Sequence, residues 1–173
     1  TCRPRHVLLC GRWSAHLATT TTRDGHALTD VAAAHAVRDA LARLRAICDE
    51  SGTHLWLLLE VPYQDRMPDP RQRVLARHWL GRELAAVGVD RQSHAHSQRV
   101  VRDLFAPLAG ERLHLLDLAE PFFAADGVSR VGPESGPWWY TNADHISPTG
   151  ARDVLGPLLA PLFERIAADC ERR

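Results

Sequence analysis

The fold is decided by the stretch Leu55-Trp56-Leu57-Leu58-Leu59-Glu60-Val61, which is followed by Pro62. It is a short apolar run that ends at a residue unable to donate a backbone hydrogen bond. Such a run is typical of a buried strand in a parallel sheet. Two further apolar runs, residues 6–10 and 113–118, predict two more strands of the same kind.

The segments between these strands have apolar residues at helical spacing, which predicts helices. Apolar residues recur at helical spacing over residues 31–48, with arginines and an aspartate between them. Thr29 or Asp30 can cap this helix, and Gly52 stops it. The same periodicity marks residues 71–87 and 91–108. Strands that alternate with helices predict an α/β domain with a parallel sheet.

Two further segments complete the predicted architecture. Residues 14–25 are polar, and the β-branched residues 19–22 are poor at starting a helix, so we interpret this segment as a polar connection. Ser147 and Pro148 form a good helix start, with the serine as N-cap and the proline in the first turn. We expect this last helix to break near Pro157 or Pro161.

Composition limits the possible classes of protein. The chain has 173 residues, of which 45% are hydrophobic and 24% charged, as in a single globular domain spanning residues 1–173. Its 21 basic and 21 acidic residues cancel, so the net charge offers no basis for binding nucleic acid. No apolar run approaches the roughly 18 residues that a membrane-spanning helix needs, and the first residues show no signal-peptide pattern.

The sequence also gives no reason to expect a metal or another cofactor. The four cysteines are far apart and form no Cys-x-x-Cys pair, which excludes a zinc ribbon or a thioredoxin motif. His94 and His96 resemble a ligand pair, but residues two apart on a helix point to different faces. We therefore expect both imidazoles to be solvated, and we expect no metal and no cofactor.

The carboxyl ends of the predicted strands are where a ligand would bind in an open parallel sheet. Of the segments at this edge, the loop that ends at His145 carries the most chemistry. A catalytic histidine must be held in one tautomer through its Nδ1 atom. Asn142, three residues earlier, can reach that atom across a turn. Asp144 is directly adjacent, where neighbouring side chains usually diverge, so we expect it to be less well placed.

The pattern Tyr140-x-x-x-Asp144-His145-Ile146-Ser147-x-x-Gly150 is similar to the last motif of SGNH hydrolases. The closest resemblance is to the SGNH domain fused behind membrane O-acyltransferases that modify bacterial surface sugars (acyltransferase family 3). Residues 6–16, a strand followed by Trp13, resemble an early strand of that family. Residues 59–62, with Asp65 and Pro68 in the loop after them, resemble its next strand.

This resemblance implies a fold, an activity and site residues. The fold would be a three-layer α/β/α arrangement with a parallel, flavodoxin-like sheet. The activity would be transfer or removal of an O-acyl group, acetyl above all, on an envelope carbohydrate. The implied partners are an acyl donor, a carbohydrate acceptor and a membrane acyltransferase domain, with an extracytoplasmic, membrane-tethered location. His145 would be the general base, oriented by Asn142 or Asp144; the substrate and oxyanion region would contain Gly11, Arg12, Trp13, Ser14 and Tyr140.

Two departures from the family pattern leave alternatives open. The chain contains no Gly-Asp-Ser motif and no Gly-x-Ser-x-Gly elbow, and Asn142 occupies a position where the family usually has aspartate. Aligned on the motifs, residue 1 falls after the first two strands of the family, so we expect an N-terminally incomplete domain with residues 6–10 at a sheet edge. Within the chain Ser14 is a candidate for the nucleophile, but a weaker one than a serine that lies outside this sequence.

Three hypotheses follow. The first is a serine O-acyltransferase or esterase of SGNH type whose nucleophile lies outside this sequence. The second is a catalytically inactive SGNH-like domain that binds carbohydrate or acts as a scaffold. The third is a different α/β binding protein in which His145 has no catalytic role.

Overall fold

A computed structural model describes the chain at residues 4–21, 24–64, 70–82, 87–133 and 137–171. These residues form two compact units. The first unit contains the chain up to Glu60 together with Ser97–Asp117. The second unit contains Val61–His96 and Leu118–Glu171. Each unit is described separately below.

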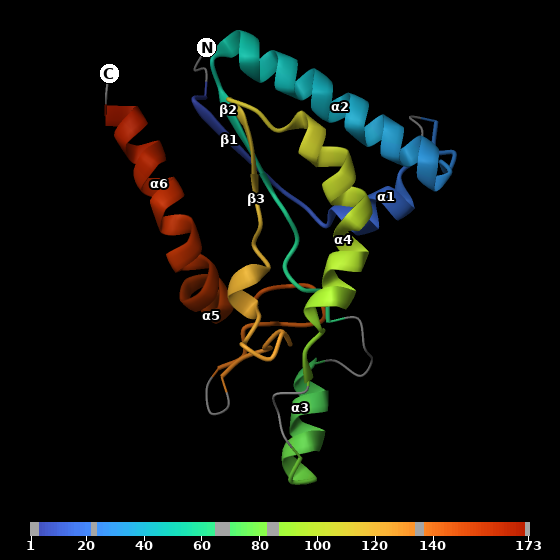
Figure 1. Ribbon diagram of the computed structural model, residues 1–173, viewed down its shortest axis with the longest axis vertical. Coiled ribbons are helices and arrows are strands. Elements are labelled where there is room, and N and C mark those ends of the chain that lie inside the picture. The colour runs from blue at the N-terminus through green and yellow to red at the C-terminus, as the bar shows by residue number, and fades with distance from the viewer. Residues whose placement is uncertain (1–3, 22–23, 65–69, 83–86, 134–136, 172–173) are drawn as a thin grey trace. The chain divides into compact units, whose positions relative to one another are not determined.

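The first unit is built on a parallel sheet of three strands, β1 (His6–Cys10), β2 (His54–Leu58) and β3 (Leu113–Leu116), in the order β1-β2-β3 (Figure 1). All three predicted strands are present, and the α/β class is confirmed. β2 ends at Leu58, three residues before the predicted end. Within the described residues β1 lies at an edge of the sheet, as expected.

One face of this sheet carries the core of the first unit. Alternate side chains of a strand point to the same face, and Leu55, Leu57 and Leu59 all contribute to this core. Two helices cover them, α2 (Asp30–Ser51) and the part of α4 (Arg91–Phe105) that follows His96. Burial of each such side chain contributes about 1.5–3 kcal/mol. The buried members of the core are Leu41, Cys48, Leu55, Leu57, Leu59, Val101, Phe105 and Leu113.

The other face of the sheet carries a row of rings. His6 stacks on His54 and His54 on His114, each pair with 5.3 Å between ring centroids. Trp56 stacks on His114 at 4.1 Å and donates its indole N–H to Nδ1 of His6. Nδ1 of His54 lies 3.0 Å from Nε2 of His114, so one of these two nitrogens carries the proton and the other accepts it. The strand register therefore aligns the rings.

α2 begins and ends as the sequence predicts. The Thr29 hydroxyl accepts a hydrogen bond from the backbone N–H of Ala32, which satisfies one of the unpaired donors of the first turn. Gly52 ends the helix in the left-handed conformation at φ 70°, where a residue without Cβ is unstrained. α4 is also confirmed, and the short 3₁₀ helix η2 (Ala106–Leu108) completes the predicted segment.

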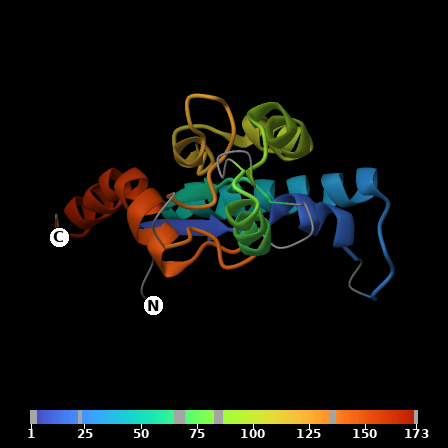
Figure 2. The same cartoon turned by 90° about the horizontal axis from the view of Figure 1, so that it is seen from below.

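α1 (Trp13–Thr19) forms at the start of the polar segment 14–25 and was not predicted, whereas none of the described residues 19–21 starts a helix, as predicted. Figure 2 shows β1 leading into this helix. Three of the seven residues of α1, Ala15, Leu17 and Ala18, favour a helix, and the β-branched residues 20–22 lie beyond its end. Its first turn is held by side chains distant in sequence: Trp13 donates to the carbonyl of Leu58, and Ser14 donates to Glu60. These tertiary contacts add to the helix preference of the residues that form α1.

The second unit has its own apolar core. It contains α3 (Pro70–Trp79), the 3₁₀ helix η3 (Glu120–Phe122), and the consecutive helices α5 (Pro148–Gly150), η4 (Ala151–Leu155) and α6 (Gly156–Glu171). α3 ends at Trp79, and a turn at Leu80 and Gly81 follows, in which Gly81 has a φ of +60°. The helix predicted over residues 71–87 is therefore shorter than expected, and residues 83–86 lie outside the described residues. The buried core residues are Val74, Val87, Phe122, Val131, Tyr140 and Val154.

The last helix is irregular before its prolines, not at them. η4 is a π-helical turn in which the N–H of Gly156 bonds to the carbonyl of Ala151, five residues earlier. Pro157 then lies in the first turn of α6, where the missing N–H breaks little, and Pro161 lies inside that helix. The irregular turn thus ends two residues before Pro157, near one of the two predicted positions, whereas the helix continues through Pro161. No helix among the described residues has both the length and the apolar character to span a bilayer.

Candidate active site

His145 closes a short, well-defined loop in the second unit. The backbone N–H of Thr141 donates to the carbonyl of His145 at 2.7 Å, and Tyr140 pairs with Ile146 in an antiparallel bridge. The N–H of Ser147 donates to the carbonyl of Trp139 at 2.8 Å. These bonds join the two ends of the loop, so the histidine sits at the end of a small hairpin that leads into α5.

Asn142 organises the inside of this loop. Its Oδ1 atom accepts the backbone N–H of Asp144 at 3.1 Å and that of His145 at 2.9 Å, which is the pattern of an Asx turn. The same oxygen lies 2.9 Å from Nδ1 of His145. The asparagine therefore acts as a turn residue and as a partner of the imidazole at once.

Asp144 also reaches the imidazole. Its Oδ1 lies 2.9 Å from Nδ1 of His145, so the expected divergence of these adjacent side chains is wrong. The Asx turn bends the backbone enough to bring both side chains to the same side. Two oxygens at Nδ1 favour the tautomer with hydrogen on that nitrogen, which leaves the lone pair on Nε2. The His145 side chain is 72% exposed and that of Asp144 only 22%.

Two contacts anchor the loop to the segment after β2. The Tyr140 hydroxyl donates to the carbonyl of Pro62 at 2.8 Å, and the N–H of Gln64 donates to the carbonyl of Ala143 at 2.8 Å. Tyr140 is 1% exposed, and its burial raises the pKa of the phenol well above the usual value. The loop is thus fixed at its base and near its middle.

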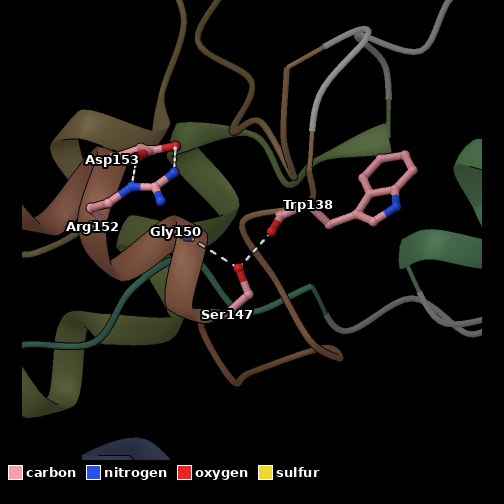
Figure 3. Close-up of polar contacts among 5 residues, drawn as sticks. All are labelled: Trp138, Ser147, Gly150, Arg152 and Asp153. Carbon is pink, nitrogen blue, oxygen red and sulfur yellow. Dashed lines mark hydrogen bonds and ion pairs between the residues drawn. The ribbon is translucent and has the colours of Figure 1, made fainter.

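Ser147 fixes the exit of the loop. Its hydroxyl donates to the carbonyl of Trp138 and accepts from the N–H of Gly150 at 3.0 Å, as Figure 3 shows. This is the predicted N-cap of α5. Both contacts of the hydroxyl are to backbone atoms, so it serves the turn and not a reaction. Figure 3 also shows the exposed ion pair between Arg152 and Asp153 on the following turn.

The predicted substrate and oxyanion residues 11–14 belong to the first unit. Trp13 packs edge-on against Phe105, with 5.2 Å between ring centroids, and its indole N–H donates to the carbonyl of Leu58 at 2.9 Å. Trp13 is therefore a core contact of the first unit. Gly11 follows β1, and Arg12 precedes the first residue of α1.

Ser14 is bound to a carboxylate that the sequence analysis did not single out. Glu60 is 8% exposed, and it accepts the backbone N–H of Ser14, the Ser14 hydroxyl at 2.8 Å and Nε2 of Gln98 at 3.1 Å. Burial of its sulfur and the nearby Glu60 charge raise the pKa of the Cys10 thiol. The sequence signal that could have identified Glu60 is its position as an acidic residue within an apolar run.

Comparison with known protein families identifies the chain. The model of the family described as SGNH domain (fused to AT3 domains) matches residues 2–161. The chain belongs to this SGNH domain family. No curated protein matches it. Family membership indicates a function of the acyltransferase or esterase type, and the AT3 fusion indicates a membrane-associated protein with an acyltransferase domain in its intact form.

Within this SGNH domain, the structure brings Asn142, Asp144 and His145 together on one loop of the second unit, with Tyr140 at its base. Tyr140, Asp144 and His145 belong to the motif that resembles the family, whereas Asn142 lies where the family usually has aspartate. Residues 11–14 belong to the first unit, where the Ser14 hydroxyl donates to Glu60 and the Trp13 indole donates to the carbonyl of Leu58.

His94 and His96, which the sequence analysis expected to be solvated, differ in their exposure. His94 is buried, 4% exposed, with its ring 5.8 Å from that of Phe123, so the expectation of a solvated side chain is wrong for it. His96 is exposed. Among the described residues, no group of three or more histidine, cysteine, aspartate or glutamate side chains could hold a metal ion.

Proposed function

We propose that this SGNH domain transfers an O-acyl group, acetyl in particular, to or from a bacterial envelope carbohydrate by a Ser-His mechanism with His145 as general base. The observation that carries the proposal is the pair of oxygens, from Asn142 and Asp144, each 2.9 Å from Nδ1 of an exposed imidazole. A general base needs this arrangement, because a fixed Nδ1–H directs the Nε2 lone pair outward.

The chemistry follows from the two nitrogens of His145. Nε2 takes the proton of a serine hydroxyl as the serine oxygen attacks the ester carbonyl, and the resulting imidazolium gives that proton to the departing alcohol. The acyl-serine is then resolved by a sugar hydroxyl in transfer, or by water in removal. The Asp144 carboxylate stabilises the imidazolium by its charge, a role that the neutral amide of Asn142 cannot fill.

The proposal assigns the nucleophilic serine to a Gly-Asp-Ser motif outside these 173 residues, because the sequence contains no such motif. Residues 11–14 are proposed to line the substrate and oxyanion region. Ser14 is a poor nucleophile candidate, since its hydroxyl and its backbone N–H bind the same buried carboxylate. Trp138 and Trp139, both half-buried beside the His145 loop, offer aromatic surface on which a sugar ring could stack.

The test is an esterase assay on the product of the full open reading frame with a chromogenic acetate ester. His145→Ala is expected to lower turnover by about 10²–10⁴-fold, the usual contribution of a general base. Asp144→Asn is expected to lower turnover, and Asn142→Asp to preserve or raise it. His96→Ala, which changes an exposed histidine of α4, is the matched control. Full activity in His145→Ala would show that the assignment is wrong.

A second candidate is a catalytically inactive SGNH domain that binds carbohydrate. Asn142, at the position where an aspartate is usual, favours it. In that case calorimetry should detect binding of envelope polysaccharide to the intact protein, and the esterase assay should detect no release of acetate. His145→Ala should leave the affinity for the polysaccharide unchanged.

A further inference from the structure

Helix α3, in the second unit, carries an exposed apolar surface that the proposed function does not use. Leu75 is 53% exposed, Trp79 is 85% exposed and Leu80 is 66% exposed. Among the described residues, three of the seven exposed large hydrophobic side chains therefore fall within six consecutive positions. Single exposed apolar residues are ordinary on a protein surface, but a group of them on one helix marks an interaction site.

The helix geometry places these side chains together. Leu75 and Trp79 are four residues apart and share a face. The N–H of Leu80 donates to the carbonyl of Ala76 at 3.1 Å, so the helical pattern continues one residue beyond α3 before Gly81 ends it. We call Leu75, Ala76, Trp79 and Leu80 the outer face of α3. At 100° per residue, it lies opposite Val74, which is 4% exposed and anchors the helix in the core of its unit.

The segment that carries the outer face is net basic in sequence. Between Pro70 and Arg82 the sequence has four arginines and one histidine and no acidic residue, although the whole chain has equal numbers of basic and acidic residues. Asp69 and Glu83 flank the segment directly, so residues 69–83, with four arginines and two acidic residues, have a formal net charge of +2. Arg73 donates to the carbonyl of Val87 and is half-buried, whereas His78 and Arg82 are exposed. The helix thus combines an apolar face with a locally positive charge.

We propose that the outer face of α3 binds the interfacial region of an anionic phospholipid bilayer. Tryptophan favours the headgroup level of a membrane, where its ring is half in an apolar and half in a polar environment. Leucines beside it enter the acyl boundary, and arginines bind phosphates, the composition of helices that lie in the membrane interface. This inference does not depend on the activity proposed for His145.

A second copy of this chain fits the outer face less well. A two-fold contact between two outer faces would place the same basic residues of each copy opposite one another. The apolar surface would then be buried at the cost of repulsion between like charges. An anionic surface gains from both the apolar side chains and the positive charge, so it is the occupant that we infer.

The test is co-sedimentation of the purified 173-residue chain with vesicles of phosphatidylcholine alone and of phosphatidylcholine mixed with phosphatidylglycerol. We expect binding to the anionic vesicles only, and weaker binding as salt rises. Trp79→Ser is expected to weaken binding about tenfold or more, because an apolar contact worth about 1.4 kcal/mol or more is lost. Arg82→Gln is expected to weaken binding to a smaller extent.

Phe163→Ser is the matched control, since Phe163 on α6 is 53% exposed and lies outside the outer face. It is expected to leave vesicle binding unchanged. Trp79 is largely exposed, so its substitution should preserve the fold, and far-ultraviolet circular dichroism checks this. The proposal is overturned by a lack of sedimentation, by equal binding to both vesicle types, or by equal losses in Trp79→Ser and Phe163→Ser. A dimer in analytical ultracentrifugation that Trp79→Ser abolishes would assign the face to a second copy instead.

Discussion

The oxygen of one side chain, Oδ1 of Asn142, accepts two backbone N–H groups and lies beside Nδ1 of His145. A carbonyl oxygen has two lone pairs, so the imidazole competes with the turn for this acceptor. The nearby Asp144 oxygen relieves that competition by offering Nδ1 a second partner. The loop therefore combines a neutral residue that shapes the turn with a charged residue that can stabilise an imidazolium.

The first prediction concerns this division of roles. Asn142→Ala is expected to destabilise the fold by about 1–2 kcal/mol, because two backbone N–H groups lose their acceptor. Asn142→Asp retains an oxygen at the same position and should remain near the stability of the original chain. Urea denaturation of both variants measures the difference. Equal stability of all three proteins would show that the Asx turn contributes nothing.

The second prediction concerns Tyr140 at high pH. Burial raises the pKa of its phenol in the folded state, while the unfolded value is about 10. Above that pH the unfolded chain releases the proton and the folded chain keeps it, so stability falls as pH rises, by up to about 1.4 kcal/mol per pH unit. Below about pH 9 the phenol is neutral in both states and this contribution is constant.

Tyr140→Phe removes that contribution and also the bond to the Pro62 carbonyl. The variant is expected to be about 1–2 kcal/mol less stable at neutral pH. The gap between the two proteins should shrink as pH rises past 10, and denaturation at a series of pH values measures it. A gap that stays constant through this range would contradict the assignment of a buried phenol.

Individual site residues differ in how far the sequence could reveal them. The three-residue spacing from Asn142 to His145 predicts contact across a turn, and the structure has that contact. The approach of Asp144 to Nδ1 depends on how the Asx turn bends the backbone, and spacing alone does not give it. Glu60 was missed because its partners, Ser14 and Gln98, lie 46 and 38 residues away.

Among the elements, α1 depends most on contacts from elsewhere in the chain. The Glu60 carboxylate binds the first turn of α1 and Gln98 of α4, and so ties both helices to the end of β2. These contacts fix the first turn of a short helix that has no side-chain N-cap of its own. This difference explains why the sequence predicts α2 well, with its own cap and stop, and does not predict α1.

The third prediction tests the hydrogen bonds that Glu60 accepts from Ser14 and Gln98. Glu60→Ala is expected to destabilise the protein by about 1–3 kcal/mol, because the N–H of Ser14 and the amide of Gln98 lose a buried acceptor. Loss of helix content, measured by circular dichroism, should accompany it. Glu164→Ala, at an exposed position of α6, is the control and should change little. Similar behaviour of the two variants would mean that Glu60 does not hold α1.

The fourth prediction compares two glycines of the last helical segment. A Cβ at Gly150 would lie 2.3 Å from the carbonyl oxygen of Trp139, whereas a Cβ at Gly156 would lie 3.6 Å from that of Ala151, an ordinary contact. Gly150→Ala is expected to destabilise by about 1–3 kcal/mol through overpacking. Gly156→Ala is expected to stabilise by about 0.5–1 kcal/mol through helix propensity. Thermal denaturation separates the two, and a stabilising Gly150→Ala would contradict the close approach.

At the scale of the whole molecule, each of the two units has its own buried core. The sequence predicts the α/β class correctly because strand runs and helix periods are local patterns. It does not predict the division into two units, which depends on which distant segments contact one another.

The fifth prediction follows from the charge of the whole chain. Acidic and basic residues balance at 21 each, the calculated isoelectric point is about 7.1, and ten histidines can gain a proton below neutral pH. Solubility should be lowest near pH 7 and rise toward pH 5 as the molecule becomes positive. Precipitation by polyethylene glycol across this range measures it. A solubility that is highest at pH 7 would count against this account.

The parallel sheet described above has a consequence for the time that the chain needs to reach its native state. Its strand partners lie about 50 and about 60 residues apart in the sequence, as the contacts of Trp56 with His6 and of His54 with His114 show. Each pairing closes a long loop before any strand contact forms, which costs chain entropy early and slows the reaction. Refolding is therefore expected to take milliseconds to seconds, with the unpaired strands exposed to aggregation meanwhile.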